Sequence, residues 1–349
     1  MASTLMDLAR GGRRVVLAAA RAAGVSNRLA DSEWRRRRLL ILCYHGVALR
    51  DEHEWDPEVF VTPAFLRRRF EILRDGGYAV LPLGPAIDLL RAGELPQRAV
   101  AITFDDGFYD FSAAAVPLLQ EFGYAATLYL STYHCVYQRP LLLLSLEYLL
   151  WRARGTKFPA HILSGHAIAA DLTRVTERKS LARRLASAAR TFGNDRDKQM
   201  IWLSQIADSL GVDWQDFLQS RILHFMSPSE VTEVSRRGID VQLHTHRHRT
   251  PRDEKSFRLE ILENREIVES LTNLPATHFC YPEGDCDATF FSWLRDLGVK
   301  TATTCATGLA KRESNPLALP RFVDTSLQTE LMFGSWLSGV AGMSRRDAR

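Results

Sequence analysis

The sequence has no apolar run long enough to span a bilayer, which takes about 20 residues. The run at 15–20 is closed by Arg21, and the run at 141–151 is interrupted by Ser145 and Glu147. The first run is also shorter than the apolar part of a signal peptide. We therefore expect neither a transmembrane segment nor a cleaved leader, and we expect the protein in the cytoplasm.

Cysteine is scarce and shows no regular spacing. The five cysteines make an odd number, and no two of them form a Cys-x-x-Cys pair. This argues against a disulfide framework and is typical of reduced, mostly buried thiols in a cytoplasmic protein.

A large excess of charge of one sign is also absent. The formal net charge of +4 over 349 residues predicts no nucleic-acid partner. The cations nevertheless gather at the ends, with nine arginines before Leu39 and three among the last five residues. Solvation is the simpler interpretation of these basic ends, and peripheral contact with an anionic membrane, at its inner face, is the alternative.

One stretch stands out from this ordinary composition. Residues 100–104 form a short, mostly apolar run that predicts a buried strand, and the run ends abruptly in Asp105, Asp106 and Gly107. Two carboxylates at the end of a buried strand are costly unless their charge is used. A cation explains them, with one carboxylate as its ligand and the other as a base. The alternative is a simple cap for the next helix.

The rest of the chain repeats a strand-then-helix pattern. Buried strands are expected at 39–44, 78–81, 100–104, 125–131, 239–243, 277–281, 299–303 and 317–321. The helices between them, including one at 110–121 that Pro117 should kink, imply a largely parallel α/β sheet. Seven or so such strands with short loops predict a closed or nearly closed barrel, with its active site at the carboxyl ends of the strands.

Between 132 and 226 helical stretches replace the strands. We interpret this region as a helical insertion that covers a barrel edge or shapes a substrate groove. The expected organisation is a basic N-terminal helical segment at 1–38, the barrel at 39–325, and a C-terminal helix with a basic tail at 326–349.

A second group of chemically active residues follows the expected strand at 239–243. His244 and His248 are four residues apart, so in a loop that turns into a helix both can reach one point. With Asp106 they form a two-histidine, one-carboxylate set with open coordination positions, which suits Zn²⁺ or another divalent first-row metal. His246 is the alternative second ligand, although in an extended segment its side chain points the other way.

These residues resemble the motifs of the polysaccharide deacetylases with a NodB-homology domain, carbohydrate esterase family 4. Thr-Phe-Asp-Asp-Gly at 103–107 matches the first motif, His-Thr-His-Arg-His at 244–248 matches the second, and Phe-Cys-Tyr-Pro-Glu-Gly at 279–284 resembles the third. The resemblance covers about 39–325 and implies a distorted, incomplete (β/α)₇ barrel. It also implies that Asp105 is the general base and that Asp106, His244 and His248 bind a metal that polarises an acetamide carbonyl.

The third motif departs from the family pattern at two positions. Cys280 stands where the family usually has arginine, and Glu283 stands where it has tyrosine. The resemblance assigns the oxyanion-binding N–H to the position of Glu283, within a substrate-binding segment of Tyr281, Pro282 and Glu283. An added carboxylate here would oppose the oxyanion.

Two roles are therefore assigned to residues outside the usual motifs. Arg321, in a Leu-Pro-Arg sequence, is the candidate to replace the missing arginine beside Asp105, and a surface salt bridge is the equal alternative. The family's late Leu-x-His motif is absent, because no histidine follows His278. Tyr44-His45 resembles the Tyr-His motif of the poly-N-acetylglucosamine deacetylase subgroup, so His45 is the expected general acid.

The resemblance predicts a metal-dependent hydrolase that removes N-acetyl groups from a polysaccharide, an oligosaccharide or a lipid-linked sugar. Zn²⁺ is the expected metal, with Co²⁺, Ni²⁺ or Mn²⁺ as alternatives, and an acetylated saccharide is the expected partner. The second hypothesis is the same chemistry on an O-acetyl or another C–N substrate. The third, a catalytically inactive saccharide-binding domain, is kept open by Glu283 and the missing late histidine. The sugar itself depends on loops and is not named by the sequence.

Overall fold

The computed structural model describes residues 18, 24–138, 141–155, 158, 170–193 and 195–343. Among them, seven parallel strands are hydrogen-bonded into a ring in the order β1-β11-β9-β8-β7-β6-β5, with β5 pairing back to β1. The ring strands are β1 (Arg38–Tyr44), β5 (Ala99–Phe104), β6 (Thr127–Leu130), β7 (Asp240–Leu243), β8 (His278–Cys280), β9 (Thr301–Thr307) and β11 (Leu319–Val323).

The predicted seven-stranded α/β barrel is thereby confirmed, and its distortion is visible at two places. The register shifts between Leu319 and Arg321 of β11, and a single residue pair, Leu243 with Phe279, joins β7 to β8. The strands are parallel, so all their carboxyl ends lie at one end of the ring. That end is where Asp105 follows β5.

In the part of the chain that the structure describes, four short strands lie outside the ring. β4 (Ala79–Val80) pairs with β5, and β10 (Ala310–Lys311) pairs antiparallel with β1. β2 (Gly46–Val47) and β3 (Phe60–Val61) pair with each other just after the end of β1. The expected strand at 78–81 is therefore present, but as an extension of the ring.

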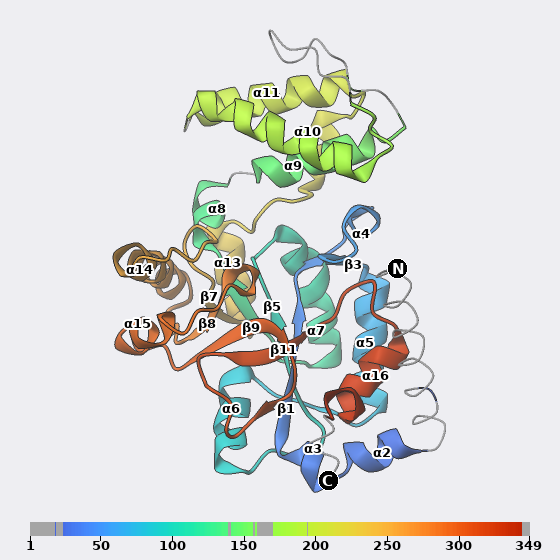
Figure 1. The fold of residues 1–349 in the computed structure, drawn as a ribbon, viewed down its shortest axis with the longest axis vertical. Coiled ribbons are helices and arrows are strands. Elements are labelled where there is room, and N and C mark those ends of the chain that lie inside the picture. Colours follow the sequence, from blue (N-terminus) through green and yellow to red (C-terminus); the bar gives the residue numbers. More distant parts are fainter. Residues whose placement is uncertain are drawn as a thin grey trace, which may run out of the picture.

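Helices surround the ring (Figure 1). They are α5 (Pro63–Asp75), α6 (Leu83–Ala92), α7 (Val116–Phe122), α13 (Pro228–Arg236), α14 (Glu254–Thr272), α15 (Phe290–Asp296) and α16 (Glu330–Ser338). Three of these helices begin at a capping side chain. Thr62 caps α5, Asp253 caps α14, and Ser227 with Glu230 forms the capping box of α13.

The helix expected at 110–121 differs from the prediction. Phe111–Ala115 forms a π-turn, and α7 begins only after it. Pro117 therefore lies in the first turn of α7, where a missing backbone N–H costs that helix no hydrogen bond. A change of helix type is found where a kink at Pro117 was expected.

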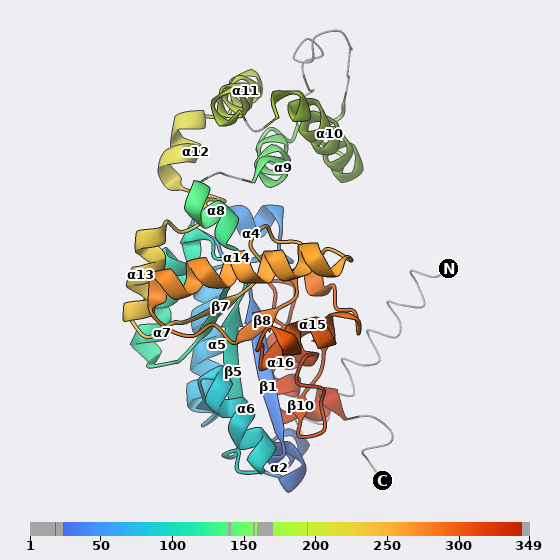
Figure 2. The ribbon, with the colours of Figure 1, turned by 90° about the vertical axis from the view of Figure 1, so that its left-hand side faces the viewer.

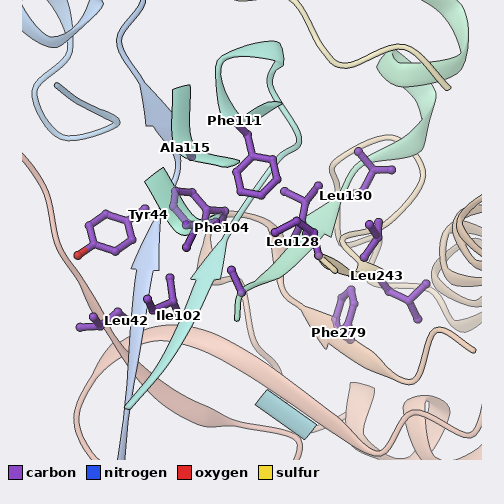
Figure 3. Packing of buried hydrophobic residues seen from close by; sticks show 14 of the residues in the cluster. Leu42, Tyr44, Ile102, Phe104, Phe111, Ala115, Leu128, Leu130, Leu243 and Phe279 are labelled. Carbon is purple, nitrogen blue, oxygen red and sulfur yellow. The ribbon is translucent and has the colours of Figure 1, made fainter. Parts of the chain in front are cut away.

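The two faces of the strands belong to different cores, because successive side chains point to opposite sides. Leu42, Ile102 and Leu128 belong to the main core between the ring and its helices (Figure 3). Ile41 and Ala101 belong to a second core that joins side chains of β1, β5, β6, β8 and β11 to α6. This second set is the interior of the barrel.

After β6 the chain leaves the barrel and forms the predicted helical insertion. It contains α8 (Thr132–Tyr137), α9 (Leu142–Arg152), α10 (Val175–Ala188), the short η3 (Ala189–Phe192), α11 (Arg196–Ser209) and α12 (Trp214–Ser220). Most of these helices share a hydrophobic core that includes Leu149, Leu185 and Ile206. The insertion stands beyond the carboxyl ends of the strands, with α4 (Glu52–Trp55) between it and the barrel (Figure 2).

The basic ends lie largely outside the described residues. Of the segment 1–38 the structure describes Ala18 and residues 24–38, which include α2 (Val25–Ala30) and α3 (Glu33–Arg36). At the other end, η5 (Val340–Gly342) is described and the arginines of the tail are not. No helix of the described part is both long and apolar enough to cross a membrane. The domain boundaries and the membrane contact stay predictions.

A buried ion pair fixes α5 to the end of β11. Arg69 Nε lies 2.9 Å from Asp324 Oδ2, and the Tyr44 hydroxyl donates to the same oxygen at 3.0 Å. The Arg69 and Asp324 side chains are only 2% and 0% exposed. Replacing Arg69 with Met leaves a buried carboxylate without its cation, so the free energy of unfolding should fall by about 3–5 kcal/mol in urea denaturation.

The matched control is the neighbouring residue. Arg68 pairs with Glu330, but these side chains are 50% and 45% exposed, so Arg68→Met should cost less than about 1 kcal/mol. Burial raises the pKa of Asp324 to about 6 even beside Arg69. In the Arg69 variant the Asp324 carboxyl can take up a proton as the pH falls. The loss of unfolding free energy should therefore be smaller at acidic pH than at neutral pH. Equal losses from the two variants would contradict this account.

Candidate active site

The carboxyl end of β5 separates two adjacent carboxylates. Asp105 is buried and follows Ala101 and Thr103 on the interior face of the barrel. Asp106, with φ 73°, and Gly107, with φ 94°, both take the left-handed conformation, so the chain turns sharply after Asp105. Glycine suits this turn because residues with a Cβ rarely adopt such a φ, and a Cβ on Gly107 would also lie 2.3 Å from Leu130 Cδ1.

Asp106, His244 and His248 come together at this end of the barrel. The Nε2 atoms of His244 and His248 lie 3.3 Å and 3.1 Å from Asp106 Oδ1, and all three ligand atoms lie within 4.8 Å of one another. Ligands about 2.0–2.1 Å from a tetrahedral metal stand roughly 3.3 Å apart. The residues predicted as metal ligands therefore fit a divalent ion such as zinc in both atom type and separation.

The backbone around the two histidines is held by buried partners. His244 Nδ1 lies 2.8 Å from the Cys280 carbonyl oxygen, which leaves Nε2 for a metal. The backbone N–H of His244 donates to Asn264 Oδ1 at 2.9 Å. Thr245 and His248 have φ of 61° and 53°, an uncommon conformation for residues other than glycine. This loop is shaped to turn His248 back toward Asp106.

His246 is not brought into this set. Its Nδ1 lies 2.8 Å from Thr132 Oγ1 at the start of the insertion, and its backbone N–H donates to the Glu260 carbonyl. His246 therefore joins the second-motif loop to α8 and α14. In the described structure the ligand set contains His248 and leaves out His246.

Sequence reasoning missed two residues that hold this loop. Asn264 donates from Nδ2 to Thr132 Oγ1 and to the Leu130 carbonyl while it accepts from His244. Glu260 accepts hydrogen bonds from the Arg247 backbone and side chain. A signal was present, since both polar residues lie among the apolar positions of α14 and are buried there.

Arg321 lies against Asp105 inside the barrel. Its two terminal nitrogens donate to the two carboxylate oxygens, both at 2.7 Å, and Arg321 is fully buried. The Sγ of Cys280 lies 3.1 Å from Arg321 and 3.5 Å from Asp105. The short Cys280 side chain thus leaves room on β8 for an arginine that arrives from β11.

This pair sets the charge of Asp105. Burial alone would raise the pKa of its carboxyl, but the Arg321 guanidinium outweighs that effect and holds the pKa well below its usual range. Two further groups of possible metal-binding side chains include Asp105, one with Cys43 and His45 and one with His244 and Cys280. The Arg321 cation beside Asp105 opposes a second cation at either group.

His45 lies beside Asp105. Its Nε2 is 3.7 Å from Asp105 Oδ2, and its side chain is partly exposed while that of Asp105 is not. The residue comes directly after β1, the ring neighbour of β5. The structure thus places the predicted acid next to the predicted base.

The third motif divides between core and surface. Tyr281 is buried and donates its hydroxyl to the Leu317 carbonyl at 2.8 Å, so its side chain does not face a substrate. Pro282 is also buried, whereas Glu283 is exposed and left-handed, with φ 56°. The Glu283 N–H has no hydrogen-bond partner among the described residues. Of the three predicted substrate-binding residues, Glu283 alone offers a free backbone donor.

The charges of the ligand set suit a metal. Burial would raise the pKa of Asp106, but hydrogen bonds from His244 and His248 bring it well below its usual value. Burial would lower the pKa of His248, but its contact with Asp106 raises it instead. A metal needs the neutral imidazole, so protons compete for His248 and metal affinity should fall as the pH falls.

A family model described as "Polysaccharide deacetylase" matches residues 92–194 and 204–302, together more than half of the chain. Two curated relatives are poly-β-1,6-N-acetyl-D-glucosamine N-deacetylases of Escherichia coli, from strain K12 and from O157:H7. Each is 32% identical over 99 residues, which are 28% of this chain. The match covers only 14% of the length of these relatives.

Solved structures with a similar fold include the Streptococcus pyogenes deacetylase PplD in complex with acetate, at TM-score 0.56 and 16% identity, with 88% of this chain and 98% of that chain covered. IcaB from Ammonifex degensii aligns at TM-score 0.54 and 16% identity, over 86% of this chain and 97% of that chain. At these identities the likeness concerns the fold.

Proposed function

The chain belongs to the polysaccharide deacetylase family, and we propose that it is a metal-dependent hydrolase that releases acetate from an N-acetylated poly- or oligosaccharide or lipid-linked sugar. The observation that carries this proposal is the convergence of Asp106, His244 and His248 beside a second, buried carboxylate. The N-acetylated substrate is favoured by the similarity to the Escherichia coli relatives, which are N-deacetylases. Glucosamine-type sugars are therefore the first substrates to test.

Each residue at the site has a chemical task in this proposal. Asp106, His244 and His248 would hold a divalent metal, which would supply a Lewis acid for the acetyl carbonyl and for water. Asp105, kept ionised by Arg321, accepts the proton of the attacking water. Because its pKa is low, Asp105 is a weak base, so the transfer depends on how acidic that water is.

The other end of the reaction falls to Glu283 and His45. The free N–H of Glu283 donates to the oxygen on which negative charge develops. His45 delivers a proton to the departing amine. Because its Nε2 lies only 3.7 Å from Asp105 Oδ2, the proton that Asp105 takes from water can pass to His45. Water and the acetamide are thereby converted to acetate and a free amine.

His45→Ala should slow turnover by about 10²–10⁴-fold without changing the metal content. The amine leaves poorly without a proton, whereas the ligand set is untouched because His45 lies beside Asp105. Steady-state acetate release and metal analysis of the same preparation measure the two quantities. Unchanged turnover would show that another group supplies the proton.

A panel of acetylated saccharides tests the proposed reaction. Purified protein should release acetate from N-acetylglucosamine oligosaccharides, and a chelator should stop the release. Faster chelator-sensitive release from O-acetylated sugars would favour the second hypothesis. Saccharide binding without release from any member of the panel would identify an inactive binding domain.

The expected cytoplasmic location is part of the proposal, and cell fractionation measures it.

A further inference from the structure

A cavity of about 840 Å³ lies at the end of the barrel opposite the candidate active site. Its walls come from α3, the start of β1, the end of α6, and β10 with the turn that follows. These elements meet at the amino-terminal ends of β1 and β5, whereas Asp105 follows a carboxyl end. We call this cavity the basal pocket; α3 and α6 mark its end of the molecule in Figure 1.

The basal pocket is lined by an excess of cations. The five basic residues are Arg36, Arg37, Arg38, Lys311 and Arg312. Against them stand two carboxylates, Glu33 and Glu313. Arg36 pairs with Glu33, but Arg37, Lys311 and Arg312 are exposed and form no ion pair with another described residue. The pocket thus keeps a positive field that its own acids do not cancel.

The sheet register brings two of these cations together. In the antiparallel pair of β1 and β10, Arg38 stands directly opposite Lys311, and like charges in that position destabilise a sheet. The Arg38 guanidinium stacks 3.9 Å over the Trp34 ring and donates to the Trp34 carbonyl at 2.7 Å. One cation is therefore already positioned at the pocket wall, beside Lys311 of β10.

We propose that the basal pocket binds phosphate groups of anionic phospholipids and holds the protein at a membrane surface. Guanidinium groups bind phosphate oxygens through paired N–H donors, which suits a pocket with arginines from two distant parts of the chain.

A membrane surface is favoured over a soluble phosphate by what precedes the pocket in the chain. The residues leading into α3 include Arg10, Arg13, Arg14, Arg21 and Arg28. Each cation near an anionic leaflet adds to the attraction, so a basic segment that precedes the pocket in the sequence adds more to binding at a surface than to binding of one small ion.

The test uses the full chain and vesicles of phosphatidylcholine with or without phosphatidylglycerol. The protein should co-sediment with the phosphatidylglycerol vesicles alone, and salt should weaken the binding. The double charge reversal Arg37→Glu, Arg312→Glu should weaken it about tenfold or more. Its matched control is Arg190→Glu, Arg295→Glu, because both residues are exposed, lie outside the pocket and make the same change in net charge.

Four outcomes would overturn the proposal. The wild type could bind both vesicle types equally, or it could bind neither. The pocket variant could also bind as tightly as the wild type, and that result would place the contact in the N-terminal segment alone. Inorganic phosphate could instead stabilise the wild type but not the pocket variant, while the wild type binds no vesicles. That result would identify a soluble phosphate ligand. Acetate release is measured in parallel, since none of these residues lies near Asp105 or the histidines.

Discussion

Asp105→Asn should lower the rate of acetate release by about 10²–10⁴-fold while the purified protein keeps its metal. The amide accepts no proton from water, yet Asp106, His244 and His248 are unchanged. This outcome would separate the two adjacent aspartates into a base and a ligand. Loss of the metal with Asp105→Asn would show that the two roles are reversed.

A second variant separates chemistry from folding. Asn at 105 leaves Arg321 buried without a counter-charge, which is destabilising. The double variant Asp105→Asn, Arg321→Met removes both charges and should recover stability in thermal melts without recovering turnover. Recovery of turnover together with stability would contradict the assignment of Asp105 as base.

His248→Ala should remove both the bound metal and the activity. The variant leaves two of the three ligand atoms that converge in the structure, and losing even a supporting partner of a metal ligand costs about 10–100-fold in affinity. A loss of more than a hundredfold in metal affinity is therefore expected, measured by competition with a chromogenic chelator. Turnover should fall in proportion to the metal lost.

His246→Ala is the matched control from the same loop. It removes the contact with Thr132 but none of the three ligand atoms, so the metal should stay bound with at most a modest loss of affinity. The opposite result, metal lost from the His246 variant and kept by the His248 variant, would revive the alternative ligand.

The sequence carried enough information for the barrel and for the residues at its strand ends. A buried apolar run that stops in two aspartates, and two histidines four residues apart after another strand, are local patterns. Parallel strands then bring such ends together. Arg321 and His45 were also found in this way, because each lies at or just after a strand.

The remaining features depend on distant contacts that no local pattern encodes. The hydrogen bonds of Asn264 join His244 to Thr132 and Leu130, more than a hundred residues away. The register that sets Arg38 against Lys311 joins the two ends of the barrel sequence. The burial of Tyr281 is likewise decided by packing, with its hydroxyl on Leu317. The π-turn before Pro117 is a local feature, yet residue propensities did not predict it.

Acetate release should require one divalent metal, held by Asp106, His244 and His248. The direct measurement is a titration of chelated, metal-free protein with Zn²⁺, following acetate release from an N-acetylglucosamine oligosaccharide. Activity should be absent at the start, rise in proportion to added metal, and reach a plateau at one ion per chain. Full activity in the metal-free protein, or a metal-replete protein that releases no acetate, would contradict the claim.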